Sequence, residues 1–375
     1  MHLKVRRDAH RPDLHSEYDL TVAAALTAID LFSGAGGASQ GLRDVGYTVL
    51  AAIENDPSAV ETFRANHPET EMLARDVRRV GAPALARRLR ASQTRLDLLT
   101  ACPPCQPFST LGSGDPDDPR NRLVSSLMRF VRHLRPRAVL LENVPGLRCE
   151  PRFARLVADL EADYRVRQYI VQATDFGVPQ ERRRVIVLGI DRAMSVEPPE
   201  CLLDALPASF DASPRTAGEA LAAAATLTTD VDPVHRARTP RPKTLARIRA
   251  VAQGGGRVEL PEHLQLACHV RLGQRHATSI YGRIDPKRPA PTMTTRCTTP
   301  SCGRFIHPTE DRGLTLREAA LLQTFPLDYK FCGNHESVER QIGNAVPPLL
   351  AKALGLVVAQ LLGSGAGAQP TPRAA

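Results

Sequence analysis

The sequence predicts an α/β fold in which a parallel sheet with crossover helices forms a large domain and a different kind of module follows it. Apolar stretches of strand length alternate with stretches of helical periodicity from Thr27 to Ile190, and this alternation is typical of parallel sheets. From about Asp191 the alternation stops. The chain has 375 residues, which is long for one compact domain and suits a large domain joined to a smaller one.

The elements of the first part follow one another in a regular order. Short apolar stretches predict buried strands at 27–32, 47–55, 96–101 and 137–143. A glycine-rich segment leads from the first strand into a helix, and a second helix is expected from Pro57. The segment RLVSSLMRFVRHL has helical spacing between the last two of these strands. Two stretches between Tyr169 and Ile190 are expected to close the sheet as a strand pair.

The second part is distinguished by its charge. Residues 192–232 carry seven acidic and two basic side chains, whereas residues 233–283 carry ten basic and two acidic ones. Regular patterning returns with a helix at Thr315–Phe325, whose first residue and Glu318 form the signature of a capping box. A last amphipathic helix is expected at Pro347–Gly363, followed by a frayed tail.

The composition favours a folded cytoplasmic protein. The formal charge of +9 points to a polyanionic partner. The alternative cause of the many arginines is a GC-rich genome, which favours arginine and alanine codons. We expect no apolar run of membrane-spanning length, and the first 20 residues lack the apolar core of a secretory signal. The eight cysteines are then expected to stay reduced.

A glycine-rich turn followed by acidic residues predicts a site for a nucleoside cofactor. Gly34–Gly37 come directly after the first strand, where glycines let the backbone approach a ligand closely. The dinucleotide pattern G-x-G-x-x-G/A fails because its last position is Ser39. Glu54 ends the second strand, where a carboxylate can accept two ribose hydroxyls; Asp76 falls where a third strand should end and could accept from an adenine amino group. The alternative is a plain strand–turn–helix joint with surface acids.

Two cysteines, Cys102 and Cys105, flank two prolines and allow three interpretations. A structural zinc site would need a second pair at close spacing, and the nearest candidates, Cys297 and Cys302, lie far along the chain. A redox pair belongs in a thioredoxin-like unit, which the glycine-rich turn argues against. A nucleophile at Cys105 fits best, because ligands bind at the carboxyl ends of parallel strands. Cys102 is then expected to be a small packed side chain, and no metal is expected.

Six short motifs occur in order along the chain: FSGAGG, PPCQPFS, ENVPG, QERRR, RPAPT and QIGNAVPPLLAKALG. Over about residues 27–190 and 286–363, the chain resembles the bacterial DNA (cytosine-5) methyltransferases. The resemblance implies a Rossmann-like, S-adenosylmethionine-dependent methyltransferase domain, a smaller target-recognition domain and a C-terminal helix that returns to the large domain. The implied segments are an N-terminal extension (1–26), a catalytic cofactor-binding domain (27–190), a target-recognition domain (191–312), a C-terminal part completing the catalytic domain (313–363) and a disordered tail (364–375).

The resemblance also implies roles for individual residues. Cys105 matches the cysteine that adds to C6 of the target cytosine, and Glu142 matches a glutamate that in its protonated form holds the N3 edge of the base. Arg182 and Arg184 match arginines that line the active site, the alternative being an ordinary exposed strand. The implied cofactor is S-adenosylmethionine, and its expected contacts, together with Glu54 and Asp76 above, are Phe32, Gly34, Gly36, Pro104, Asn344 and Val346.

The implied reaction transfers a methyl group to C5 of a cytosine in a specific double-stranded DNA sequence. Thiolate addition at C6 makes C5 a nucleophile, and a hydrogen bond at N3 disperses the charge that develops. The base must first leave the duplex, and the segment 109–122 is expected to be a loop that closes over the DNA. The basic block suits phosphate and base contacts. Candidate DNA-binding residues are Gln180, Arg271, Gln274, Arg275 and Arg283.

The expected partners are double-stranded DNA and a cognate restriction endonuclease that acts on the same site. We expect a cytoplasmic, nucleoid-associated monomer that has no contact with a membrane. Two alternatives keep the fold. One branch of the family with a similar Pro-Pro-Cys motif methylates transfer RNA, but the long basic insert favours DNA. The other alternative is a catalytically inactive DNA-binding regulator, against which the complete set of catalytic motif residues speaks.

Overall fold

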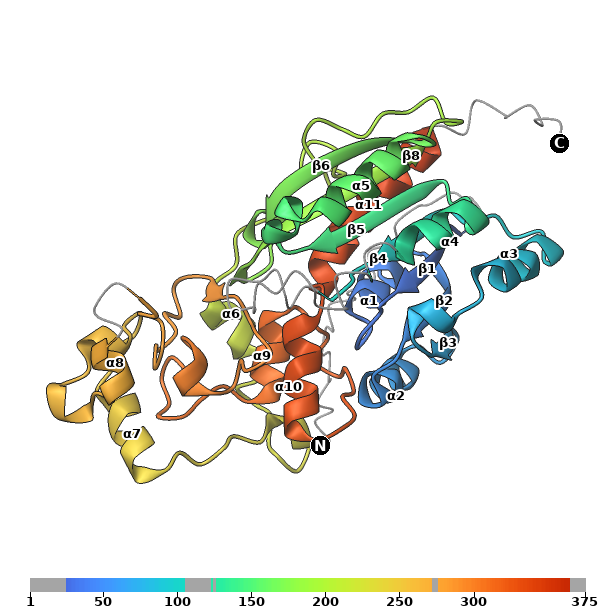
Figure 1. The fold of residues 1–375 in the computed structure, drawn as a ribbon. Helices are drawn as coiled ribbons and strands as arrows, with labels where there is room; N and C mark the ends of the chain where they lie inside the picture. The colour runs from blue at the N-terminus through green and yellow to red at the C-terminus, as the bar shows by residue number, and fades with distance from the viewer. Residues whose placement is uncertain (1–24, 105–122, 124–125, 272–275, 365–375) are drawn as a thin grey trace, which may run out of the picture.

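The computed structural model describes residues 25–104, 123, 126–271 and 276–364, and Figure 1 shows their arrangement. Cys105, Gln274 and Arg275 lie outside these residues, as do the predicted closing loop and nearly all of the predicted N-terminal extension and C-terminal tail. The described chain forms a large sheet domain with a second region of short helices and irregular segments beside it, in which α7 and α8 lie farthest from the sheet (Figure 1).

A seven-stranded sheet forms the large domain and confirms the predicted α/β fold. Its strand order is β3-β2-β1-β4-β5-β8-β6. Neighbouring strands are parallel except at β8, which runs antiparallel to β5 and β6. β8 reverses direction because only a short connection joins it to β6, whereas a parallel neighbour needs a long crossover. The strands are β1 (Thr27–Leu31), β2 (Thr48–Glu54), β3 (Glu71–Ala74), β4 (Leu98–Ala101), β5 (Ala138–Asn143), β6 (Tyr164–Gln172) and β8 (Arg183–Asp191).

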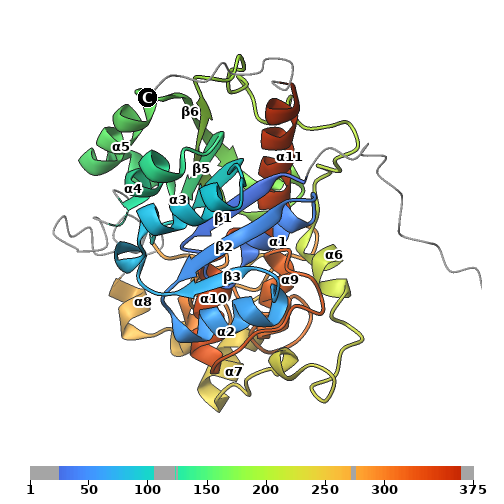
Figure 2. The same ribbon diagram turned by 90° about the vertical axis from the view of Figure 1, so that its right-hand side faces the viewer.

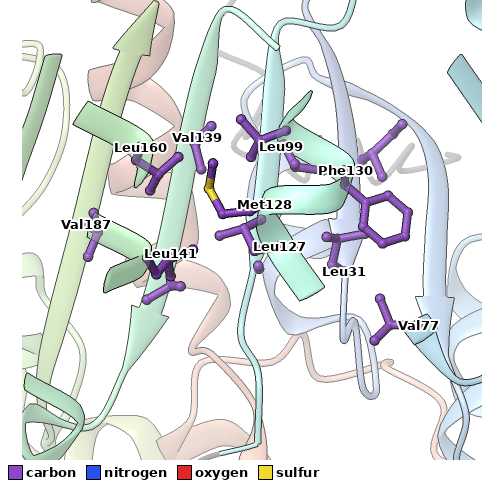
Figure 3. Packing of buried hydrophobic residues seen from close by; sticks show 14 of the residues in the cluster. Leu31, Val77, Leu99, Leu127, Met128, Phe130, Val139, Leu141, Leu160 and Val187 are labelled. Carbon is purple, nitrogen blue, oxygen red and sulfur yellow. The ribbon is translucent and has the colours of Figure 1, made fainter. Parts of the chain in front are cut away.

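Helices cover both faces of this sheet, as Figure 2 shows. They are α1 (Gly37–Arg43), α2 (Pro57–Asn66), α3 (Ala82–Ala91), α4 (Ser126–Leu134), α5 (Pro151–Glu161) and α11 (Pro348–Ser364). Alternate residues of a strand point to opposite faces. Leu99 and Leu141 therefore belong to a core with α3, α4 and α5, part of which appears in Figure 3, whereas Leu98 and Leu140 belong to a core with α1 and α11.

The C-terminal helix α11 returns to the large domain, as predicted. It packs on α1 so closely that a Cβ at Gly41 would lie 2.6 Å from the backbone nitrogen of Lys352. The hydroxyl of Tyr47, the residue before β2, donates to the Gly355 carbonyl oxygen at 3.0 Å. The expectation that no apolar run reaches membrane-spanning length is wrong for the helical segment His335–Gly363, which is long and apolar enough to cross a membrane. In this structure, however, 67% of its most apolar stretch is buried inside the protein.

The second region has its own small cores. It contains α6 (Ala217–Ala222), α7 (Pro242–Arg249) and α8 (Ala267–Arg271), and a short sheet in which β7 (Gln180–Glu181) pairs with β9 (Ala290–Pro291). One core consists of Ile248, Val251, Leu260, Tyr281 and Ile306. These side chains come from segments distant in sequence, so the region is held by tertiary contacts more than by long regular elements.

Helices α9 (Leu316–Leu322) and α10 (His335–Asn344) lie on the far side of the predicted boundary at residue 312 but share a core with the second region. In this core, Leu316 and Ile342 pack with Phe305 and Met293. The predicted capping box is present: the Thr315 hydroxyl accepts from the Glu318 N–H, and the Glu318 carboxylate accepts from the Thr315 N–H. Of the segment 313–363, α11 is the part that packs on the sheet.

Candidate active site

A pocket of about 410 Å³ opens where the strands of the large sheet reach their carboxyl ends. Its walls come from the glycine-rich turn, the ends of β2 and β3, the segment 102–104 and the end of α10. This is the edge at which open α/β sheets bind ligands, and the volume lies in the range of small-molecule sites. The lining includes these predicted cofactor residues: Phe32, Gly34, Glu54, Asp76, Pro104, Asn344 and Val346.

Gly36 is the predicted cofactor residue that does not line the pocket. It has a positive φ of 93°, precedes α1 and faces the interior. A Cβ at this position would lie 2.7 Å from His67 Nε2 and 2.8 Å from the Tyr329 hydroxyl. Glycine is therefore needed here to pack the turn against these two side chains rather than to contact a ligand.

Glu54 is held rigidly at the pocket wall. Its carboxylate accepts three backbone N–H groups, from Gly34 at 2.9 Å, Asn55 at 2.7 Å and Asp56 at 2.8 Å. A carboxylate offers about four acceptor positions, so one lone-pair direction remains for a ligand. The bonds fix its orientation before any ligand arrives.

Asp76, across the pocket, is ionised and partly engaged. The Arg78 guanidinium lies 2.5 Å from it and the Arg78 N–H donates to it at 2.8 Å. The hydrogen bonds from Arg78 lower the pKa of Asp76 to about 2. The carboxylate therefore presents a fixed negative charge, part of which Arg78 neutralises.

Asp30 is a pocket residue that the sequence analysis did not identify. It lies at the end of β1, is fully buried and lines the pocket. The Ser39 hydroxyl donates to its Oδ2 at 2.7 Å. Burial raises the pKa of Asp30 to about 7, and the charge of Glu54 adds to the effect. Ser39, which breaks the dinucleotide pattern, is thus the hydrogen-bond partner of Asp30. The sequence signal that could have identified Asp30 is an acidic residue just before a glycine-rich turn.

Glu142 lies near the end of β5 and is bracketed by two side chains. Arg184 Nε of the antiparallel neighbour β8 is 2.8 Å from Glu142 Oε1, and both side chains are almost fully buried. The Cys102 thiol donates to Glu142 Oε2 at 2.8 Å. Cys102 packs against the apolar core, as expected of a small packed side chain, and its sulfur in addition contacts the carboxylate and lines the pocket.

The residue after Glu142 holds the segment that leads to Cys105. The Asn143 amide donates to the Pro103 carbonyl oxygen at 2.8 Å and its side-chain oxygen accepts from the Val144 N–H. The Cys102 N–H donates to the Leu31 carbonyl oxygen at 3.3 Å. The segment 102–104 is thereby fixed to both β1 and β5, and its last residue, Pro104, lines the pocket.

A sequence model of C-5 cytosine-specific DNA methylases matches residues 26–359, which is most of the chain. The chain belongs to this methylase family. Among its relatives, the type II methylase M.HgiDII of Herpetosiphon aurantiacus is 33% identical over 347 residues, which cover 89% of this chain and 95% of that protein. The type II methyltransferase M1.HphI of Haemophilus parahaemolyticus is 32% identical over 359 residues, covering 91% and 89%.

Solved structures share the fold of this methylase. A candidate DNA modification methyltransferase encoded within an E. coli prophage matches with a TM-score of 0.72 at 24% identity, over 90% of this chain and 100% of that chain. The Dnmt2 methyltransferase of S. pombe matches with a TM-score of 0.60 at 18% identity, over 90% and 99%. At these identities the likeness concerns the fold alone.

Gln180 and Arg182 of the methylase lie in a buried joint with the second region and the end of α10. Gln180 is fully buried, and its amide donates to the Leu322 carbonyl and to the Gln323 side chain. The Arg182 guanidinium, 2% exposed, donates to backbone carbonyls of Met293, Gly343 and Ala345. These partners join β7 to the second region and to the end of α10, so the surroundings favour a structural role over the predicted base and DNA contacts.

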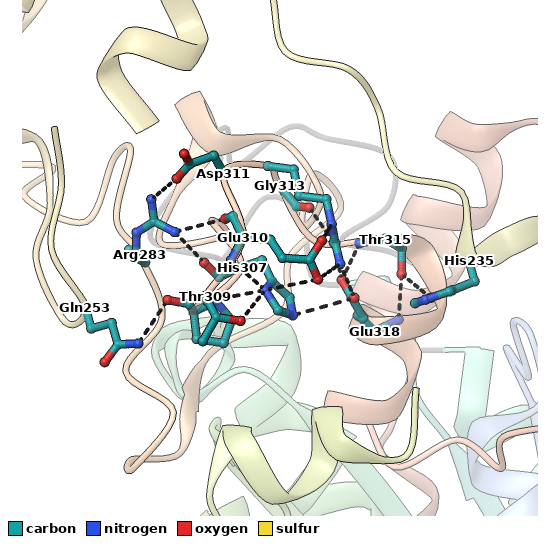
Figure 4. A network of polar contacts seen from close by, with 12 residues as sticks. His235, Gln253, Arg283, His307, Thr309, Glu310, Asp311, Gly313, Thr315 and Glu318 are labelled. Carbon is teal, nitrogen blue, oxygen red and sulfur yellow. Dashed lines mark hydrogen bonds and ion pairs between the residues drawn. The ribbon is translucent and has the colours of Figure 1, made fainter. Parts of the chain in front are cut away.

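Arg283 of the methylase is also buried, and Figure 4 shows part of its network of polar contacts. Its guanidinium makes five hydrogen bonds, to the carbonyl oxygens of Ile248, Val251, His307 and Glu310 and to the Asp311 carboxylate. A guanidinium has five N–H donors, so these bonds leave none for DNA. Arg271, in contrast, is exposed at the end of α8.

One group of metal-ligating residue types occurs among the described residues: His307, Glu310 and Glu318. The Arg312 guanidinium already lies 2.8 Å from the Glu310 carboxylate and 2.7 Å from that of Glu318. His307 Nδ1 accepts the Glu310 N–H at 3.1 Å. Because a cation and a backbone donor occupy these ligand atoms, we infer no metal site here.

Proposed function

We propose that this methylase transfers a methyl group from S-adenosylmethionine to C5 of a flipped-out cytosine in a specific double-stranded DNA sequence, through a transient bond between the Cys105 sulfur and C6. The observation that supports the proposal best is the placing of Glu142. Its buried carboxylate contacts both Arg184 and Cys102. Cys102 lies three residues before Cys105 in the chain and lines a pocket of cofactor size.

The proposed steps use the side chains around Glu142. The Cys105 thiolate adds to C6, and the electron pair of the C5–C6 double bond moves onto C5 and toward N3. Glu142, carrying a proton, donates to N3 and stabilises the charge that develops there. Arg184 holds the Glu142 carboxyl in place. After methyl transfer a base removes the C5 proton, and the electrons of that bond expel the Cys105 thiolate.

The pocket residues fit the cofactor. S-adenosylmethionine supplies an electrophilic methyl group bound to a positively charged sulfur. Glu54 presents a fixed carboxylate with one free acceptor position suited to a ribose hydroxyl, and Asp76 presents a second acceptor. Asp30 adds a buried carboxyl that can balance a positive charge. Phe32 and Val346 supply apolar surface beside them.

The second region supports a role in binding DNA. We propose that 191–312 is the target-recognition part and that α9 and α10 belong with it, because they share its core. Exposed cations in this part include Arg236, Arg238, Arg241, Lys243 and Arg271, which suit phosphate contacts. We further propose that the protein acts as a cytoplasmic monomer and that a restriction endonuclease for the same site accompanies it, since relatives carry type II names.

Labelled methyl transfer tests the proposal. Purified protein is incubated with S-adenosylmethionine carrying a labelled methyl group and either duplex DNA or transfer RNA. We expect label in DNA with wild-type protein and none with Cys105→Ala, while Cys149→Ala, which alters an exposed cysteine, keeps full activity. Label in transfer RNA alone would establish the RNA alternative. Label in neither would overturn an enzymatic function, and undiminished activity of Cys105→Ala would overturn the covalent route.

Duplex DNA with 5-fluorocytosine at the target position provides a second test. The fluorine cannot leave as a proton does, so the bond between Cys105 and C6 should persist after methyl transfer. We expect a protein–DNA adduct that survives denaturation and requires the cofactor. The absence of any adduct on DNA that is otherwise methylated would contradict covalent catalysis.

A further inference from the structure

The Cys102 thiol makes a contact that the proposed chemistry does not by itself require. Cys102 directly follows β4, and its N–H continues the β1–β4 ladder by donating to Leu31. Its sulfur lies 2.8 Å from Glu142 Oε2. In this contact the thiol is the donor and the Glu142 oxygen is the acceptor. The contact joins two neighbouring parallel strands at their carboxyl ends.

The two oxygens of Glu142 are held by different elements. Arg184 of β8 contacts Oε1, and Cys102 after β4 contacts Oε2. Either contact alone would leave the carboxyl free to turn about the bond to its neighbouring carbon, because that terminal torsion is broad. Both contacts together fix the plane of the carboxyl. A catalytic acid must meet its partner atom within a few tenths of an ångström and about ten to twenty degrees.

Cys102 also lines the cofactor pocket, together with Pro103 and Pro104. The thiol therefore lies between the pocket and the carboxyl that would act on the base. A cysteine whose only task was to fill the pocket wall would not need its sulfur on a carboxylate oxygen. The hydrogen bond indicates a role directed at Glu142.

We propose that Cys102 is a positioning residue for Glu142. Its S–H group holds the Glu142 carboxyl, opposite Arg184, in the orientation in which Glu142 donates its proton to N3 of the cytosine. An oxygen that accepts a hydrogen bond is itself a better donor when it carries a proton, because hydrogen bonds in a chain polarise one another. This inference rests on the proposed function, and it assigns a role in the reaction to Cys102 in addition to that of Cys105.

Two substitutions of Cys102 distinguish the effect of its hydrogen-bond donor from the effect of its side-chain volume. Cys102→Ser keeps an O–H donor, whereas Cys102→Ala removes it; Cys201→Ala, at a half-buried cysteine outside the pocket, serves as the control. The readouts are kcat, the KM for S-adenosylmethionine, and release of tritium from C5 of labelled cytosine DNA without cofactor. Tritium release reports addition at C6 and charge stabilisation at N3 without methyl transfer.

We expect Cys102→Ala to lower kcat and tritium release together by about tenfold, the usual effect of one charge-assisted hydrogen bond. Cys102→Ser should stay within about threefold of the wild type, and the KM for the cofactor should change by less than about threefold in both. An unchanged kcat in Cys102→Ala would overturn the inference. An equal loss of kcat in both variants would also overturn it. A rise in the KM for the cofactor alone would overturn it too, because it would show that Cys102 only lines the pocket.

The S–H stretching band of Cys102 gives a readout that does not depend on activity. The band is assigned from the infrared difference between the wild type and Cys102→Ser. In Glu142→Gln we expect this band to move to the frequency of a thiol without a hydrogen bond, or to lose intensity. A band whose frequency and intensity are the same in the wild type and in Glu142→Gln would overturn the inference. An inactive wild type with the band shift intact would instead overturn the proposed function and leave the contact established.

Discussion

The hydroxyl of Tyr329 donates to the backbone carbonyl of Ala35 at 2.5 Å and thereby ties the C-terminal part of the chain to the glycine-rich turn. The same hydroxyl lies 3.0 Å from His67 Nε2. Arg43 donates to His67 Nδ1 at 2.8 Å, so the proton of the neutral ring is on Nε2 and points to Tyr329. This chain of hydrogen bonds holds the turn whose neighbouring residue, Gly34, lines the pocket.

Removing this hydroxyl should weaken cofactor binding. We expect Tyr329→Phe to lower the affinity for S-adenosylmethionine about fivefold, which corresponds to one net hydrogen bond of roughly 1 kcal/mol. Calorimetric titration measures this. Tyr169→Phe is the matched control, because its hydroxyl donates to the Pro199 carbonyl at 2.7 Å away from the pocket. An equal loss of affinity in both variants would contradict the specific role of Tyr329.

Asp30 should make the stability depend on pH in a defined direction. Its folded pKa of about 7 lies above the ordinary aspartate pKa of 3.8, so its contribution to the free energy of unfolding is complete below about pH 4 and is lost as the pH rises through 7. Relative to Asp30→Asn, the wild type should lose on the order of 4 kcal/mol between about pH 4 and pH 8. Urea unfolding at several pH values checks this, and a constant difference would refute it.

The same carboxyl should couple cofactor binding to pH. A positively charged sulfur in the pocket favours ionised Asp30, so the affinity for S-adenosylmethionine should rise as the pH increases through about 7. Asp30→Asn should lack this dependence. S-adenosylhomocysteine, whose sulfur is neutral, is the control ligand and should show a weaker dependence. Parallel pH curves for both ligands would argue against an electrostatic role of Asp30.

Arg184 should be needed for turnover but not for cofactor binding. Arg184→Lys removes the Nε donor 2.8 Å from Glu142, and an ammonium group does not reproduce the fork of a guanidinium. We expect kcat to fall roughly 10- to 100-fold with unchanged affinity for the cofactor. Arg183→Lys, at the exposed neighbouring position, should leave kcat unaltered. Weaker cofactor binding in Arg184→Lys would contradict this prediction, because it would show that Arg184 acts on the cofactor rather than on Glu142.

Arg283 and Arg271 should differ in the kind of effect they have. Arg283→Met removes five hydrogen bonds, four to backbone carbonyls and one to Asp311, which keeps its contact with Arg249, so we expect a loss of roughly 3–5 kcal/mol in the free energy of unfolding. Arg271→Met should leave stability unchanged and reduce the salt dependence of DNA binding by about one phosphate contact. Denaturant unfolding and binding at several salt concentrations distinguish the two outcomes.

Local patterns in the sequence account for much of the fold and part of the site. The strands at β1, β2, β4 and β5, the glycine-rich turn and the capping box of Thr315 were all predictable, because each depends on neighbouring residues. The ordered motifs also brought Glu142 and the pocket residues to attention. Cys105, Gln274 and Arg275 stay predictions, since they lie outside the described residues.

The identity of the strands, the turn and the family was therefore determined by the sequence alone, since apolar periodicity and motif order are properties of the chain itself. The tertiary structure decided the direction of β8, which brings Arg184 to Glu142, and the contact of Cys102 with the same carboxylate. It also decided that Gln180, Arg182 and Arg283 are buried rather than exposed. The physical reason is that burial and hydrogen-bond partners are supplied by segments far apart in the chain, so the same arginine can face DNA or bind carbonyls depending on what packs around it.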